Sequence, residues 1–194
     1  MGFISEDKLD SIGFKSFGKN FRLSDKCSIY SPEKISIGDD VRIDDFCVLS
    51  PGSCCGYLTM GSNVHISTYV GIYAGGGIEI GDFCTISSKS TLHSTSDDFS
   101  GNYLVGPVVP EKYRNVNKRP IKMDKFSHVG AHSLVMPGVL MAEGSVLGAM
   151  SLAKMDLNPW TIYGGVPARR IKDRERNMAE LAASLLDNKI SGEY

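Results

Sequence analysis

The stretch Met123–Ala153 reads MDKFSHVGAHSLVMPGVLMAEGSVLGAMSLA and carries an apolar residue at every sixth position. These positions are Met123, Val129, Val135, Met141, Leu147 and Ala153. A period of six fits neither the helical turn of about 3.6 residues nor a hairpin meander. Because six is a multiple of two, short strands at this spacing keep one face turned inward. The stretch therefore predicts stacked coils of short strands, which form a parallel β-solenoid.

The same spacing occupies most of the chain before this stretch. Its aliphatic positions are Ile37, Ile43 and Leu49, then Met60, Ile66, Ile72 and Ile78, then Ile80, Ile86 and Leu92. A second column, four residues after the first, holds mostly small side chains, among them Cys47, Cys84, Ser127, Ser133, Ser145 and Ser151. Three six-residue faces make one triangular coil. We expect the aliphatic column to fill the interior and the small column, including Cys47 and Cys84, to pack where the wall turns.

The period slips at two places. One slip lies between Leu49 and Met60, around residues 51–56, and the other follows the triplet Gly75–Gly77. We interpret both as bulged corners. The glycine triplet lacks the Lys and Ser/Thr that a phosphate-binding loop requires.

A longer interruption, residues 93–120, separates two halves of the repeat. Loops longer than about 15 residues in compact folds are usually functional or disordered. Its aromatic residues Phe99, Tyr103 and Tyr113 argue against disorder. We therefore predict that this inserted loop forms part of a site.

The repeat divides the chain into three parts. Residues 1–26 form a lead-in, with a helix expected from Ser5 to Ile12 and capped by Ser5. Residues 27–168 form the β-helix domain with its inserted loop, and residues 169–194 form a C-terminal helix and tail. That helix is expected over Lys172–Asn188.

Composition excludes several classes of protein. The 194 residues carry 21 basic and 22 acidic side chains, a balance that does not favour nucleic acid as a partner. No apolar run reaches the roughly 18 residues of a membrane span, and the first residues lack the pattern of an export signal. The odd count of five cysteines favours the reducing cytoplasm.

The hexapeptide pattern and the closing sequence GGVPARRIK, Gly164–Lys172, resemble the left-handed β-helix acyltransferases. The similarity is nearest to galactoside and maltose acetyltransferases and to sugar acetyltransferases found with surface-polysaccharide genes. It implies an all-β fold, a left-handed parallel β-helix with an inserted loop and a C-terminal helix. It also implies acetyl transfer from acetyl-CoA to a hydroxyl or amino group of a sugar or nucleotide-linked sugar, in O-antigen or capsule synthesis. Members of this family form homotrimers with active sites between subunits.

Acyl transfer from a thioester needs a base, and histidine suits neutral pH best. Members of the family place one histidine in the loop that interrupts the repeat, and here this is His93. Asp97 and Asp98 follow, and either is a candidate to orient the imidazole, to bind sugar hydroxyls or to act as the base itself. Of the other histidines, His128 is a candidate to line the pantetheine channel, and His65 and His132 are expected on the surface.

The resemblance also implies a set of residues that bind CoA. Transferred position by position, Ala131, Ala149, Ser151 and Lys154 fall on the contacting edge. Arg169 and Lys172 match basic positions near the nucleotide phosphates, where cations suit binding.

Two other functions use the same fold. A γ-carbonic-anhydrase-like zinc enzyme requires three histidine ligands, for which His93, His128 and His132 are available. The spacing of His128 and His132 turns them in different directions, and we predict no metal site. The other alternative is a non-catalytic β-solenoid scaffold. The acceptor, the choice between O- and N-transfer and the length of the acyl group stay open.

Overall fold

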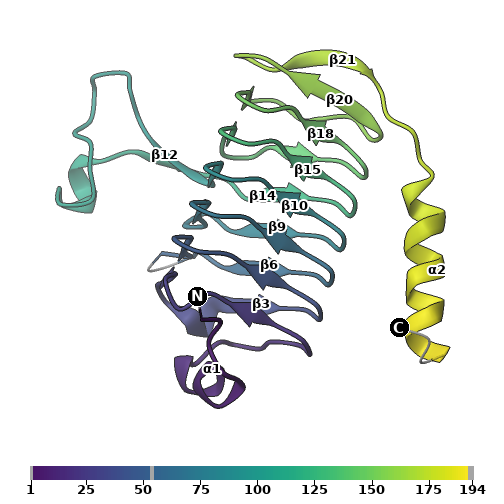
Figure 1. Cartoon of the computed structure of the whole chain (residues 1–194). Helices are drawn as coiled ribbons and strands as arrows, with labels where there is room; N and C mark the ends of the chain where they lie inside the picture. Colours follow the sequence, from purple (N-terminus) through teal and green to yellow (C-terminus); the bar gives the residue numbers. More distant parts are fainter. Residues whose placement is uncertain (1, 53–54, 192–194) are drawn as a thin grey trace.

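The chain folds into a left-handed parallel β-helix of about seven coils, as predicted (Figure 1). The computed structural model describes residues 2–52 and 55–191. Each coil passes through three parallel sheets in a fixed order, the eight-stranded, the six-stranded and the five-stranded sheet. The predicted corner at residues 51–56 lies partly outside the described residues.

The strands are short, and most contain two or three residues. The eight-stranded sheet contains β1 (Arg22–Leu23), β4 (Arg42–Ile43), β7 (His65–Ile66), β10 (Thr85–Ile86), β15 (His128–Val129), β18 (Val146–Leu147), β20 (Thr161–Gly164) and β21 (Arg169–Asp173). The six-stranded sheet contains β2 (Ser28–Ile29), β5 (Val48–Ser50), β8 (Gly71–Tyr73), β11 (Thr91–His93), β16 (Leu134–Val135) and β19 (Leu152–Ala153). The five-stranded sheet contains β3 (Ile35–Ile37), β6 (Leu58–Met60), β9 (Ile78–Ile80), β14 (Ile121–Met123) and β17 (Leu140–Met141).

The aliphatic column forms the core. In the eight-stranded sheet Ile43, Ile66, Ile86, Val129 and Leu147 stand in register from coil to coil, and each is fully buried. Burying one such side chain contributes about 1.5–3 kcal/mol. The repeat therefore stabilises the wall along its whole length.

The small column packs at the corners, as expected. Cys47 and Cys84 are fully buried, and burial raises the pKa of the Cys84 thiol to about 11. The serines of this column use their hydroxyls inside the wall. Ser133 Oγ, for example, donates to the carbonyl of Gly148 at 2.8 Å.

We number the corners in chain order. The first lies between the eight- and six-stranded sheets, the second between the six- and five-stranded sheets, and the third before the next coil. The first and third corners turn through residues with positive φ, which bulky side chains rarely adopt. At the first corner these are Phe46, Tyr69, Lys89, His132 and Met150, with φ between 53° and 61°.

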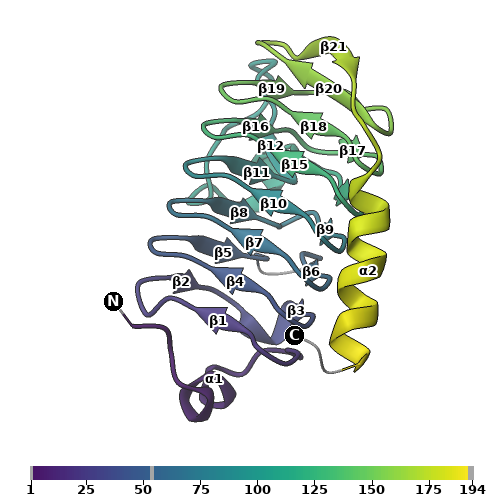
Figure 2. The same ribbon diagram turned by 45° about the vertical axis from the view of Figure 1, so that its right-hand side comes forward.

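The C-terminal helix α2 (Met178–Ser191) lies along the third corner (Figure 2). Ala182 packs with Phe126 and Trp160, whose ring centroids are 6.0 Å apart. Farther along the helix, Lys189 Nζ donates to Asp40 Oδ2 at 2.9 Å and to Asn63 Oδ1 at 3.0 Å. The helix is therefore held at both ends.

The helix begins later than the expected Lys172. Residues Arg169–Asp173 instead form β21, which pairs antiparallel with β20 and covers the edge of the last coil. Sequence reasoning assigned helix here because it weighed helix propensity without the exposed strand edge. At the other terminus, α1 (Glu6–Ile12) forms as expected, but Ser5 makes no side-chain capping hydrogen bond.

Two short 3-10 helices complete the elements of the described residues, η1 (Pro32–Lys34) and η2 (Glu111–Tyr113). No helix in the described ranges is both long enough and apolar enough to cross a bilayer.

The inserted loop forms an arm that projects from the second corner, on the side away from α2 (Figure 1). Its root is a two-stranded antiparallel ribbon of β12 (Thr95–Asp97) and β13 (Val116–Lys118). The ribbon packs against the glycine triplet Gly75–Gly77. Gly76 N donates to Ser94 Oγ at 2.8 Å, and a Cβ at Gly76 would lie 2.5 Å from the Ser94 carbonyl oxygen and 3.0 Å from Arg119 N. The triplet thus makes room for both strands of the arm.

This contact predicts that Gly76→Ala destabilises the protein. The added methyl group meets backbone that cannot turn aside, so we expect a loss of about 1–3 kcal/mol in chemical denaturation. Gly75→Ala is the matched control, because its Cβ would meet the side chain of Thr95, with the methyl group at 3.0 Å, and no backbone atom. A Gly76→Ala protein as stable as the Gly75→Ala protein would contradict the assignment.

Candidate active site

His93 ends β11 at the second corner, where the arm leaves the wall. Its ring stacks on Tyr73 from the neighbouring coil, with centroids 4.6 Å apart and an interplanar angle of 10°. The side chain is half-buried, and burial lowers the pKa of the imidazole. Burial therefore favours the uncharged imidazole of His93. Among the described residues, neither aspartate of the arm hydrogen bonds to its ring, so stacking on Tyr73 orients it instead.

The two aspartates of the arm differ in their surroundings. Asp98 accepts hydrogen bonds from Ser100 N and Asn115 Nδ2, each at 2.7 Å. Hydrogen bonds from Ser100, and then the one from Asn115, lower the pKa of the Asp98 carboxyl. The Asp97 carboxylate has no hydrogen-bond or ion-pair partner in the described part of the chain. Asp98 thus holds the arm in shape, whereas Asp97 is available to a ligand.

Lys154 shares the second corner with His93. Leu92 stands in register with Val135, and Val135 with Ala153. The residues that follow Leu92 and Ala153, which are His93 and Lys154, therefore lie at matching positions two coils apart. Adjacent parallel strands are about 4.8 Å apart, so this separation is about 10 Å along the axis.

Three other predicted CoA residues, Ala131, Ala149 and Ser151, lie at the first corner, on the opposite edge of the six-stranded sheet. Ala131 and Ala149 occupy the same position on adjacent coils, and Met150 N donates to the Ala131 carbonyl at 2.8 Å. Ser151 is buried, and its hydroxyl bonds the Ala149 carbonyl at 3.0 Å and Gly165 N at 2.9 Å. This corner can offer backbone groups to a cofactor, but the Ser151 hydroxyl is already occupied.

Arg169 and Lys172 lie on β21, at the end of the solenoid farthest from the N-terminus. Both side chains are exposed. Their neighbour Arg170 is paired with Asp173 at 2.8 Å. Exposed cations on the last coil are suitably placed for phosphates of a ligand that extends along the upper coils.

The structure brings together a pair that sequence reasoning did not find. Ser87 Oγ lies 3.3 Å from His128 Nε2 on the outer face of the eight-stranded sheet. Burial, and then the charge of Arg174, lower the pKa of His128. Ser87 and His128 are far apart in the sequence, but β10 and β15 are neighbours in the sheet. The chain between them leaves the solenoid as the arm and returns one coil higher, which brings the two side chains together. The outward position of Ser87, two residues after the Thr85 of its strand, was the available signal.

On the outer face of the eight-stranded sheet, the type of residue that follows each strand changes at the Ser87–His128 pair. At the pair and below it, the positions that follow each strand carry Ser87, Ser67, Asp44 and the buried Ser24. Above it, the corresponding positions are Gly130, Gly148 and Gly164. The upper coils therefore present a backbone surface, and the lower coils present polar side chains.

Comparison with known proteins identifies the family. A dTDP-4-amino-4,6-dideoxy-D-glucose acyltransferase of Escherichia coli is 39% identical over 181 residues, 93% of each chain. The chain belongs to the hexapeptide-repeat acyltransferases. Other relatives of this acyltransferase include the galactoside O-acetyltransferase of E. coli K12, 30% identical over 62% of this chain and 61% of that one. No protein-family profile matches the chain.

Solved structures agree with this assignment. The N-acyltransferase AntD from Bacillus cereus, in complex with dTDP-4-amino-4,6-dideoxyglucose and coenzyme A, superposes with a TM-score of 0.91. It is 46% identical and covers 96% of this chain and 97% of its own. A hexapeptide-repeat acetyltransferase from Vibrio cholerae, at 19% identity and a TM-score of 0.58, shares the fold. The predictions of an acyltransferase and of an acyl-CoA co-substrate are confirmed.

The three histidines that a zinc enzyme would need lie at separate places in this acyltransferase. His93 lies at the second corner, His128 on the eight-stranded sheet and His132 at the first corner. Within residues 2–52 and 55–191, no three His, Cys, Asp or Glu side chains are arranged to hold a metal ion. The family assignment likewise replaces the non-catalytic scaffold.

We propose that Lys154 and Arg169 bind the phosphates of acyl-CoA. Lys154→Met and Arg169→Gln should each raise the KM for acyl-CoA by roughly tenfold, which corresponds to a lost charge-assisted contact of ~1.4 kcal/mol. Lys122→Met is the control, because Lys122 is exposed on the five-stranded sheet and pairs with Asp124 at 3.2 Å. Steady-state kinetics at saturating acceptor measure the effect. An unchanged KM in both variants would refute the assignment.

Proposed function

We propose that this acyltransferase moves an acyl group from acyl-CoA to the 4-amino group of a dTDP-linked 4-amino-4,6-dideoxy sugar. One observation carries the proposal: the E. coli relative named for that reaction aligns over 93% of both chains. The AntD complex with dTDP-4-amino-4,6-dideoxyglucose adds a second relative with the same ligand. These relatives favour N-transfer over O-transfer.

The reaction requires few catalytic groups from the protein. The neutral amine attacks the thioester carbonyl, the C–S bond breaks, and the amine proton must leave as the amide forms. A carboxylate or imidazole beside the nitrogen takes this proton, and CoA departs as the thiol. Asp97 and His93 are the candidates to accept it at the root of the arm.

The AntD structures help to choose between them. They include variants of one serine and of one aspartate, which are ten residues apart in that chain. Here the same spacing joins Ser87 to Asp97 and Ser88 to Asp98. Ser87 faces outward beside His128, and Asp97 has an unoccupied carboxylate. We infer that Asp97 accepts the proton, that Ser87 contacts the acceptor and that the stacked ring of His93 forms a wall of the site.

We propose that three copies assemble with the active sites between them. His93 and Asp97 lie at the second corner, whereas Ser87 and His128 lie on a different sheet of the same chain. A site that uses all four needs the second corner of one subunit against the eight-stranded sheet of the next. The arm supports this arrangement, because Phe99 and Val108 on it are 85% and 93% exposed and call for a covering surface.

We propose that the product serves surface-polysaccharide synthesis and that the enzyme works in the cytoplasm. A putative lipopolysaccharide O-acetyltransferase, WbbJ of E. coli K12, is 27% identical over 75% of this chain. Cys27, Cys47, Cys55 and Cys84 are free thiols, which suits a reducing compartment.

The proposed reaction predicts that purified protein releases CoA thiol in the presence of acetyl-CoA and dTDP-4-amino-4,6-dideoxyglucose. The matching dTDP-6-deoxyglucose, with a 4-hydroxyl, is the control and should release less than about one hundredth as much, because its oxygen needs deprotonation to attack. Mass spectrometry of the product checks the amide. 3-Hydroxybutyryl-CoA, a ligand of AntD, tests the acyl length. Transfer to the hydroxyl sugar without transfer to the amine would refute the proposal.

The assignment of Asp97 as the base predicts different effects for substitutions of the two aspartates. Asp97→Asn should lower kcat by about 10²–10⁴, because a positioned base is removed. Asp98→Asn should cost less, because its carboxylate is engaged with Ser100 and Asn115.

His93→Gln separates the two candidate bases through the pH profile. If His93 were the base, kcat/KM would fall on the acid side below about pH 6.5, since burial lowers the pKa of the imidazole. That limb would then disappear in His93→Gln. We expect the pH dependence of kcat/KM in His93→Gln to match that of the wild type. Loss of the acid limb in His93→Gln would assign the proton transfer to His93.

A further inference from the structure

Two cysteines occupy matching positions at the first corner of the first two coils. Cys27 directly precedes β2 and Cys47 directly precedes β5, and these strands pair in register, with Ser28 opposite Val48. Ser28 N donates to the Cys47 carbonyl at 2.9 Å. The next residue in this column is Val70, whose carbonyl accepts from Val48 N at 2.9 Å. The column therefore places Cys27 directly beside Cys47.

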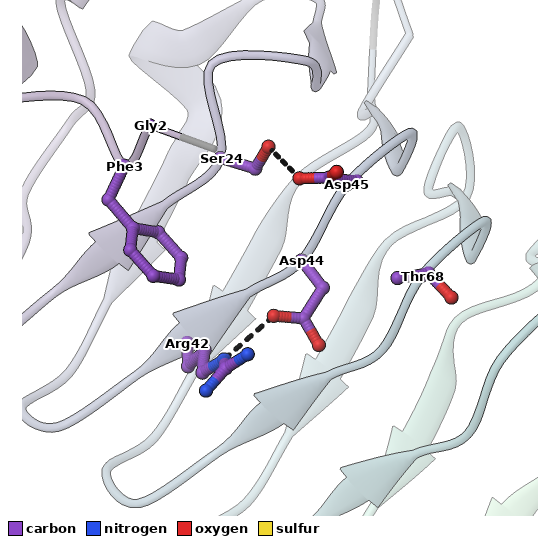
Figure 3. Close-up of a pocket in the computed structure, with 7 residues that line it drawn as sticks. All are labelled: Gly2, Phe3, Ser24, Arg42, Asp44, Asp45 and Thr68. Carbon is purple, nitrogen blue, oxygen red and sulfur yellow. Dashed lines mark hydrogen bonds and ion pairs between the residues drawn. The ribbon is translucent and has the colours of Figure 1, made fainter.

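The bonds around this corner hold the two coils close together. Ser24 Oγ, on the first coil, donates to Asp45 Oδ1, on the second, at 2.5 Å, beside the hollow shown in Figure 3. Lys26 Nζ donates to the other oxygen of Asp45 at 2.8 Å. Adjacent parallel strands lie about 4.8 Å apart, and the Cα atoms of a disulfide lie about 4.4–6.8 Å apart. The spacing of the two coils is therefore within the range that a disulfide requires.

Both thiols are free and point the same way along the stack. Cys27 Sγ donates to the carbonyl of Asp44 on the second coil at 3.1 Å. Cys47 Sγ donates in the same manner to the carbonyl of Ser67 on the third coil at 2.9 Å. Each side chain thus has a defined orientation before any reaction.

The two thiols differ in exposure and in acidity. Cys27 is partly buried, whereas Cys47 is fully buried. The neighbouring Cys47 thiol lowers the pKa of Cys27, and the Cys27 thiol together with burial raises the pKa of Cys47. An accessible thiol of lowered pKa reacts first with an oxidant, and a thiol beside it resolves the product. The pair has this division of roles.

We propose that Cys27 and Cys47 form a peroxide-responsive thiol pair that joins the first two coils when it is oxidised. The Cys27 thiolate attacks hydrogen peroxide, so that an S–O bond forms, the O–O bond breaks and hydroxide leaves. The Cys47 sulfur then attacks the sulfenic acid. An S–S bond forms, the S–O bond breaks, and the oxygen leaves as water with the Cys47 proton. Two thiols are oxidised and one peroxide is reduced to two waters, and a dithiol reductant reverses the link.

The link would strengthen the end of the stack without altering the reaction. The first coil of a solenoid has a neighbouring coil on one side alone, so it separates more easily than the coils inside the stack. A disulfide that closes a loop of about 20 residues restricts the unfolded chain and so stabilises the folded one. His93 lies two coils above Cys47 and at a different corner, so its surroundings stay the same. The inference is therefore independent of the proposed function.

The test is peptide mapping of the folded protein after treatment with hydrogen peroxide. Chymotrypsin cleaves after leucine and aromatic residues, so it separates residues 24–30, which contain Cys27, from residues 47–49, which contain Cys47. We expect mass spectrometry to find these two peptides linked and dithiothreitol to release them. Cys27→Ser should abolish the link. Cys55→Ser, at an exposed free cysteine, is the matched control and should retain it.

Urea denaturation measures the effect of the link on stability. The oxidised wild type should unfold at a midpoint roughly 1 M higher than the reduced wild type, and Cys27→Ser should show no such shift. A treated wild type in which Cys27 stays a free thiol, ends as a sulfinic acid or links to another cysteine would overturn the pair. A Cys27–Cys47 link that leaves the midpoint unchanged would overturn its role in holding the first two coils together.

Discussion

Register between coils governs this protein. The strands of each coil pair in register with those of the next coil, so a side chain on one face has a fixed neighbour above and below. The core depends on that rule, because Ile43, Ile66 and Ile86 fill the interior only while they stay in line. The site depends on it too. Tyr73 stacks under His93, and Ser87 meets His128, because their strands are adjacent in the stack. A shift of one residue would turn each of these side chains to the other face.

The repeat is the part of the structure that sequence could predict well. Its signal recurs in every coil, so occasional irregular positions do not obscure the aliphatic column. The inserted loop was also predictable, since a break stands out against a period. The secondary structure at the end of the repeat could not be predicted from the sequence. Residues 169–173 have acceptable helix formers, and only the exposed edge of β20 explains why they form a strand. Local propensity yields there to a hydrogen-bonding requirement that the sequence does not display.

The site shows a similar division. His93 and the two aspartates were identifiable because they follow the break. Their roles were not, because these depend on which carboxylate the arm uses to hold its own backbone. Asp98 is engaged by Ser100 and Asn115, the second of which lies 17 residues away along the chain. Ser87 and His128 are 41 residues apart, and their contact appears only after the arm is excluded from the coil count. The glycine triplet was found as an irregularity, but its purpose lies in the return of the chain at Arg119.

The helix α2 has a consequence for how the molecule unfolds. A stack of coils is held by contacts between neighbours, so its terminal coils can fray while the middle stays folded. Here one helix contacts Trp160 on the last coil and, through Lys189, Asp40 and Asn63 near the first coils. Loss of either end of the stack releases part of the same helix. This longitudinal tie converts a quasi-one-dimensional array into a more cooperative unit, in which the reacting coil in the middle keeps its geometry only while both ends remain folded.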